Sequence, residues 1–126
     1  MNLVNKNIGE SSVDNLFNDV TVPLLTKSVK LQAGQGVLLR GTVLGVITAS
    51  GLAVTVNSAN TDGSEKADCI LTDDVDTGTT DPVVATAYSS GLFNANALIV
   101  GGTDTVDKHK KELRTLGIFI KESLTY

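Results

Sequence analysis

Residues 37–56 read VLLRGTVLGVITASGLAVTV, and this stretch decides the fold class. It is rich in β-branched and aliphatic side chains, which favour pleated strands, and a Ser-Gly pair separates two apolar runs at a position typical of a turn. We therefore expect residues 37–49 and 52–56 to form a β-hairpin. Gly41 and Gly45 interrupt the first run, which indicates a bulge or the close approach of another backbone segment.

The rest of the chain has a matching composition. Its 126 residues suit one domain with a single core. There are 15 Val, 15 Thr and 12 Gly but only 2 Pro, while 4% of the residues are aromatic and Trp is absent. We therefore predict a mainly β fold with one short α-helix (α+β) and an aliphatic core.

Further strands are predicted on both sides of the hairpin. Residues 20–32 alternate between apolar and polar, with Pro23 at the edge or start of a strand. Gly34 and Gly36 then mark a turn rather than a phosphate-binding loop, since no third glycine and no helix follow. Residues 67–71 are the apolar part of an acidic segment and predict another strand.

A second hairpin is predicted near residue 90. Residues 82–88 form an apolar strand-like block, and residues 92–93 and 97–100 are apolar again. The intervening Ser-Ser-Gly is typical of a turn, so we expect the two blocks to pair.

Residues 103–116 carry the one convincing helix pattern. Thr103 or Asp104 is the expected N-cap, acidic residues lie early and basic residues lie late, and Gly117 is the expected stop. Residues 118–122 then return as a strand. The apolar stripe of the helix is thin, as suits a helix lying across a sheet, and consists of Val106, Leu113 and Leu116 with His109 on the same face.

The composition excludes several classes of function. A net charge of −4 is unsuited to binding nucleic acid or an anionic membrane, and no apolar run approaches the length of a membrane span. With one His and one Cys, we expect no catalytic residues, no metal site and no cofactor. His109 is expected to make helix-surface or helix–sheet contacts, and Cys69 to be a small buried hydrophobe. The acidic segment over residues 60–81 lacks the spacing of a calcium loop and indicates a solvated loop.

The N-terminal residues differ from the rest. Asparagines alternate with isolated apolar residues without a sustained period, so residues 1–22 predict an arm, and residues 23–126 a single domain. A terminus that is simply disordered in the isolated protein remains an equal alternative. The apolar residues of the arm are Leu3, Val4, Ile8, Val13, Leu16 and Phe17.

Four segments carry a resemblance to a known family. They are LRGTVLG at residues 39–45, DGSE through CIL to DVD over residues 62–76, SGLFN at residues 90–94 and LRTLGIFI at residues 113–120. Their order and spacing, over roughly residues 20–122, resemble the phage head decoration (capsid-stabilising) proteins of the lambda D type. The motif residues to which the resemblance assigns a structural role are Arg40, Gly41, Gly45, Asp62, Gly63, Gly91, Phe93 and Gly117.

The resemblance implies a compact, β-tulip-like mixed β-domain without enzymatic activity. It implies a homotrimer that binds the major capsid protein on the outer surface of the expanded head, at local three-fold sites, and stabilises the capsid against internal DNA pressure. The protein would be made in the bacterial host cytoplasm, and its arm, with the six apolar residues above, would become ordered on the capsid. The alternative is another structural virion component, such as a tail or receptor-facing β-domain; a small hydrolase or ligand-binding module is disfavoured.

Overall fold

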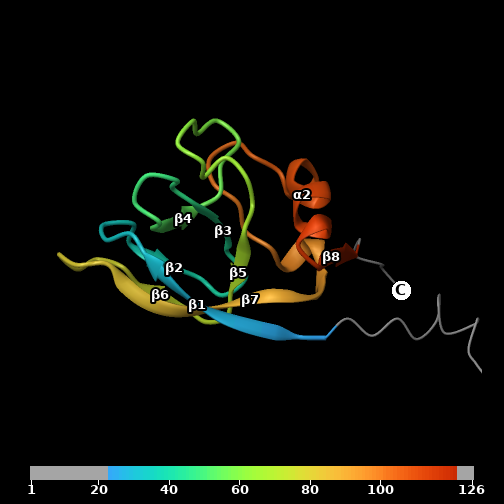
Figure 1. Cartoon of the computed structure of the whole chain (residues 1–126), viewed down its shortest axis with the longest axis horizontal. Helices are drawn as coiled ribbons and strands as arrows, with labels where there is room; N and C mark the ends of the chain where they lie inside the picture. The colour runs from blue at the N-terminus through green and yellow to red at the C-terminus, as the bar shows by residue number, and fades with distance from the viewer. Residues whose placement is uncertain (1–22, 122–126) are drawn as a thin grey trace, which may run out of the picture.

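A computed structural model describes residues 23–121, so the arm predicted for residues 1–22 lies outside the described residues, as do residues 122–126. The described part is mainly β with one short α-helix, as predicted (Figure 1). In chain order the elements are β1 (Leu25–Leu31), β2 (Val37–Leu38), β3 (Val43–Val46), β4 (Ala53–Thr55), β5 (Cys69–Leu71), β6 (Val75–Asp76), β7 (Val83–Asn94), the 3-10 helices η1 (Ala95–Ala97) and η2 (Val106–His109), α2 (Lys110–Thr115) and β8 (Ile118–Lys121).

Five of the strands close into a small barrel. They pair in the order β1-β4-β3-β5-β7, and β7 pairs back onto β1. The β1–β4 seam is short, because its register contains only the pair of Leu31 and Ala53. The side chain of Gln35 reinforces this seam: its amide nitrogen donates to the carbonyls of Gln32 (2.7 Å) and Ala53 (3.2 Å), and its oxygen accepts from the amide of Thr55 (3.3 Å).

The strands separate two apolar cores. The two faces of β3 and β5 alternate, so that Leu44 and Leu71 belong to one core and Val43 and Ile70 to the other. The first core draws buried residues from all five barrel strands and fills the barrel. The second lies between the sheet and the segment formed by α2 and β8, which gather at one end of the molecule (Figure 1). Both cores are aliphatic, as the composition predicts.

The first predicted hairpin is confirmed. β3 and β4 pair in antiparallel fashion from Leu44 opposite Thr55 to Val46 opposite Ala53. β2 is separate from this hairpin and pairs with β6 in a small second sheet. The turn at residues 34–36 and the strand at residues 69–71 also occur as predicted.

The second predicted hairpin is wrong. The Ser-Ser-Gly sequence does not reverse the chain, because β7 continues through it from Val83 to Asn94. Gly91 has φ +150°, and the pairing register with β1 shifts nearby, between Leu25 and Thr26. The glycine therefore bends the strand instead of ending it. Beyond β7 the chain forms η1, and Ile99 makes a single bridge to Thr42.

The predicted helix begins later than expected. Neither Thr103 nor Asp104 is its cap; η2 starts after Thr105, and α2 occupies only residues 110–115. The side chain of Asp104 is engaged elsewhere, as described below. Leu113 is fully buried, but Leu116 is 46% exposed and does not join the expected stripe. Gly117 ends the helix at φ +92°, as predicted, and β8 follows. Within residues 23–121, no helix has the length and apolarity needed to cross a membrane.

Candidate functional site

An apolar groove of about 400 Å³ opens where β1 begins, and we call it the entry groove. Its walls come from β5, β7 and the segments around residues 40 and 97. Leu24 and Leu92 are large apolar side chains that remain 61% and 53% exposed at this groove. The side chains that define it are Leu24, Arg40, Tyr88, Leu92, Phe93 and Leu98.

Gly91 allows the floor of the groove to form. A Cβ atom at this position would lie 2.9 Å from Leu24 Cδ1 and 2.9 Å from Phe93 Cε2, so a side chain here would force both neighbouring side chains to shift. The ring of Phe93 packs at a tilt against Tyr88, with the ring centroids 5.3 Å apart. The amide of Gly91 also donates to the carbonyl of Gly117 (3.2 Å), which ties β7 to the start of β8.

Gly41 allows the opposite wall to form. It has φ +92°, and a Cβ atom there would collide with the carbonyl oxygen of Ala97. The Gly41 amide donates to Leu71 (3.0 Å), and its carbonyl accepts from Ile99 (3.0 Å). Next to it, the Arg40 amide donates to the carboxylate of Asp74 at 2.7 Å, while the arginine side chain is exposed at the groove.

The structure divides the predicted motif residues into two groups. Arg40, Gly41 and Phe93 line the entry groove, Gly91 packs against Leu24 and Phe93, and Gly117 is bonded to Gly91. These five residues come from three of the four segments that carry the resemblance.

Gly45, Asp62 and Gly63 lie apart, where the loop after β4 packs on β3. A Cβ atom on Gly45 would meet the carbonyl oxygens of Ser64 and Lys66. The Asp62 carboxylate accepts from the amide of Ser64 at 3.1 Å and from its hydroxyl, and these hydrogen bonds hold the pKa of Asp62 below its usual value. This second group shapes a turn and does not border the groove.

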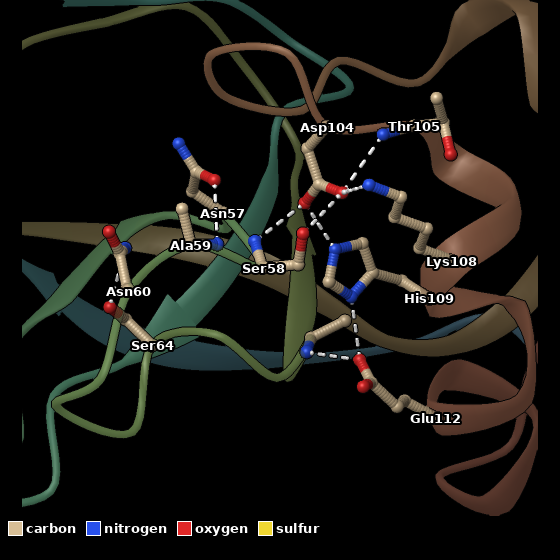
Figure 2. Close-up of polar contacts among 11 residues, drawn as sticks. Asn57, Ser58, Ala59, Asn60, Ser64, Asp104, Thr105, Lys108, His109 and Glu112 are labelled. Carbon is tan, nitrogen blue, oxygen red and sulfur yellow. Dashed lines mark hydrogen bonds and ion pairs between the residues drawn. The ribbon is translucent and has the colours of Figure 1, made fainter.

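Sequence patterns did not reveal a buried polar cluster around His109 (Figure 2). The imidazole is 1% exposed, and its two ring nitrogens face two carboxylates, Nε2 toward Asp104 and Nδ1 toward Glu112 at 2.7 Å. Asp104 also accepts from the amide (2.9 Å) and hydroxyl (3.0 Å) of Ser58, and Glu112 accepts from the amide of Ala67 (2.9 Å). The cluster therefore joins the helical segment to the loop between β4 and β5, and the burial of His109 excludes the helix-surface alternative of the two that were expected.

The charges in this cluster are coupled. Burial alone would lower the pKa of His109, but its hydrogen bonds to Asp104 and Glu112 and their negative charges outweigh burial and raise it above 6.5. Burial would raise the pKa of Asp104, but hydrogen bonds from His109, Ser58 and Thr105 outweigh it and lower that pKa to about 2. Because both imidazole nitrogens already face carboxylates and the ring is buried, the arrangement cross-links the fold and has no free base for a substrate.

These pKa shifts predict a defined pH dependence of stability. The raised pKa of His109 contributes stability that is complete below pH 6.5 and is lost as the pH rises through the folded-state value. The lowered pKa of Asp104 contributes stability that is present above pH 3.8 and is lost as the pH falls toward 2. We expect the urea midpoint to be highest between pH 3.8 and 6.5 and to fall as the pH rises above 6.5 through the folded-state pKa of His109. A His109→Gln variant should lack the alkaline fall; an identical fall in the variant would contradict this assignment.

Two further features singled out in the sequence, Cys69 and the acidic segment, have structural roles. Cys69 is fully buried in β5, as predicted, and burial, assisted by the charge of Asp68, raises the pKa of its thiol to about 12. In the acidic segment, Lys27 bonds Asp68 at 2.7 Å. Within residues 23–121, no group of three or more His, Cys, Asp or Glu side chains could hold a metal ion.

The sequence was compared with models of known protein families. A family model described as bacteriophage lambda head decoration protein D matches residues 6–118. This span includes β1 to β7, the helical segments and the start of β8, together with most of residues 1–22. The resemblance seen in the sequence begins near residue 20, whereas the family match begins at residue 6. No curated protein sequence matches the chain.

Proposed function

The chain belongs to the family of bacteriophage lambda head decoration protein D, and from this premise we propose that it binds the outer surface of the expanded phage head as a homotrimer at local three-fold sites. It is thus a structural component of the virion capsid, in a family that is generally non-enzymatic. The bound trimers would bridge neighbouring subunits of the major capsid protein and stabilise the capsid against the internal pressure of packaged DNA.

The observation that carries the proposal is the family match over residues 6–118. The geometry supports it, because the motif residues Arg40, Gly41 and Phe93, from two separate segments, line one apolar groove on the described domain. An exposed apolar groove of this kind favours contact with another segment of chain or another protein.

We propose a division of labour within the chain. Residues 1–22 form the capsid-binding arm, through Leu3, Val4, Ile8, Val13, Leu16 and Phe17, and residues 23–126 form the decoration domain. Three arms on one trimer would bind cooperatively, because docking of the first raises the effective concentration of the others and increases the apparent affinity by roughly 10² to 10⁴. Contacts that are weak singly would then hold neighbouring capsid subunits together.

Deleting residues 1–19 is expected to abolish binding to expanded, undecorated heads. Purified full-length and truncated proteins would be mixed with such heads, and occupancy would be measured by sedimentation and by electron cryo-microscopy. The matched pair Leu16→Ser/Phe17→Ser and Asn15→Ser/Asn18→Ser tests the apolar residues of the arm. The first variant should lose at least tenfold in affinity, and the second should retain it.

The same images test the remaining parts of the proposal. Density on the outside of the head at local three-fold positions would support it, whereas density on the tail would favour the alternative virion role. Full occupancy by the truncated protein would exclude the arm as the capsid-binding element. Sedimentation equilibrium of the protein before and after mixing would show whether the trimer exists in solution.

A further inference from the structure

The entry groove lies where residues 1–22 join the described domain. Leu24 is the second described residue, and its side chain lies at the groove. We propose that residues 20–22 of the same chain occupy this groove as an extended continuation of β1, with Val20 and Val22 directed into it. This inference concerns the isolated protein and does not depend on capsid binding.

The sequence next to Leu24 favours an extended strand on the correct face. Val22 precedes Pro23, and the residue before a proline is restricted to extended conformations. Side chains of an extended chain alternate between two faces, so in this arrangement Val20 and Val22 would lie on the same face as Leu24. Since Leu24 is at the groove, this face is the one that meets it. Thr21 would lie on the opposite face and provides an internal control.

Hydrogen bonds to Ser90 set the direction of the chain. The Ser90 hydroxyl donates to the carbonyl of Pro23, and it accepts from the amide of Leu25 at 3.3 Å. These contacts hold the start of β1 beside β7, with which it pairs in antiparallel fashion. Continued upstream, the register that pairs Leu25 with Ser90 would place Pro23 beside Leu92 and Thr21 beside Asn94.

This part of β7 has an open backbone edge. Among the described residues, residues 91–94 pair only with β8. The amide of Gly91 donates to the carbonyl of Gly117, the residue before β8. Successive amides of a strand point toward opposite edges, so the amides of Leu92 and Asn94 point away from β8. An extended segment over residues 20–22 would supply both a strand beside this edge and apolar side chains for the groove.

Connectivity favours this segment over other occupants. Residues 20–22 are joined to Leu24 through Pro23, so their effective concentration at the groove far exceeds that of a separate molecule. They are uncharged and carry two valines, which suits the apolar lining. Occupation would cover Leu24 and Leu92 and would give residues 1–19 a fixed point of departure from the domain.

Amide hydrogen exchange in the full-length protein tests the proposal. The amide of Asn94 should be protected in the unaltered chain. The variant Val22→Asp places a charge in the groove and should accelerate the exchange of this amide at least tenfold, with shifts in the resonances of Tyr88 and Phe93. The variant Thr21→Asp adds the same charge on the opposite face and should leave exchange within twofold of the unaltered protein. Urea unfolding of each variant would confirm that the domain remains folded.

Three outcomes would overturn the proposal. The Asn94 amide could exchange at the rate of an unstructured amide in the unaltered chain, which would show that residues 20–22 do not cover this edge. Equal effects of Val22→Asp and Thr21→Asp would show that Val22 does not enter the groove in preference to Thr21. Protection that disappears on dilution would assign the groove to a second copy of the chain.

Discussion

The variant His109→Ala is expected to lose about 3–5 kcal/mol of unfolding free energy, which is the usual cost of removing one partner from a buried ion pair. The loss is large because the imidazole is buried between two carboxylates, and the Asp104 side chain is fully buried. Without the ring, Asp104 keeps its hydrogen bonds from Ser58 but has no buried positive charge facing it. Urea denaturation followed by circular dichroism at pH 6 would measure the change.

Lys108→Ala is the matched control. Lys108 is adjacent in the same helical segment and lies 4.0 Å from Asp104, but its side chain is 55% exposed. An exposed pair of this kind contributes little, so we expect a change within about 0.5 kcal/mol. A loss for His109→Ala no larger than that of the control would show that the cluster does not stabilise the fold.

Replacing Gly45 with alanine is expected to destabilise the barrel by about 3 kcal/mol, at the upper end of the range for overpacking. The added Cβ would lie 2.9 Å from the carbonyl oxygen of Lys66 and nearer still to that of Ser64. Both obstacles are backbone atoms, so β3 and the loop must separate rather than a side chain rotating away. The φ of Gly45 lies outside the left-handed region, and the effect is therefore one of space alone.

Gly78→Ala is the matched control for the steric effect at Gly45. Gly78 also lacks a positive φ, and the only atom near its added Cβ would be the carboxylate oxygen of Asp76 at 3.0 Å, at the end of an exposed side chain. We expect its unfolding free energy to change by less than about 0.5 kcal/mol. Thermal and urea unfolding of both variants provide the measurement, and equal stabilities would contradict the close packing at Gly45.

Local patterns predicted the elements whose partners are close in sequence. The two apolar runs around the Ser-Gly pair form the β3–β4 hairpin, and Gly117 ends the helix. The pattern at residues 89–91 failed because a Ser-Ser-Gly sequence suits both a turn and a bend. Here β7 pairs with β1 before the bend and with β8 after it. A short stretch of sequence does not indicate these pairings with distant strands.

The candidate site was predictable only in part. The resemblance singled out Arg40, Gly41, Gly91, Phe93 and Gly117, which the fold gathers at or beside the entry groove. Leu24 and Tyr88 carry no special signal, because they are apolar residues of ordinary strand patterns. Asp104 was expected only as a helix cap and Glu112 was not singled out, because nothing near them in sequence indicates that Ser58 and Ala67 bond to their carboxylates.

The sequence by itself determined the composition of the core, the mainly β fold class, the first hairpin and the family. These properties depend on residue type and on spacings of a few residues, which are local. The tertiary structure alone decided that β7 is one bent strand, that His109 is buried between carboxylates and that an apolar groove adjoins Leu24. Each of these depends on which distant segments meet when the barrel closes, and apolar periodicity shows which face of a strand is buried without identifying its partner.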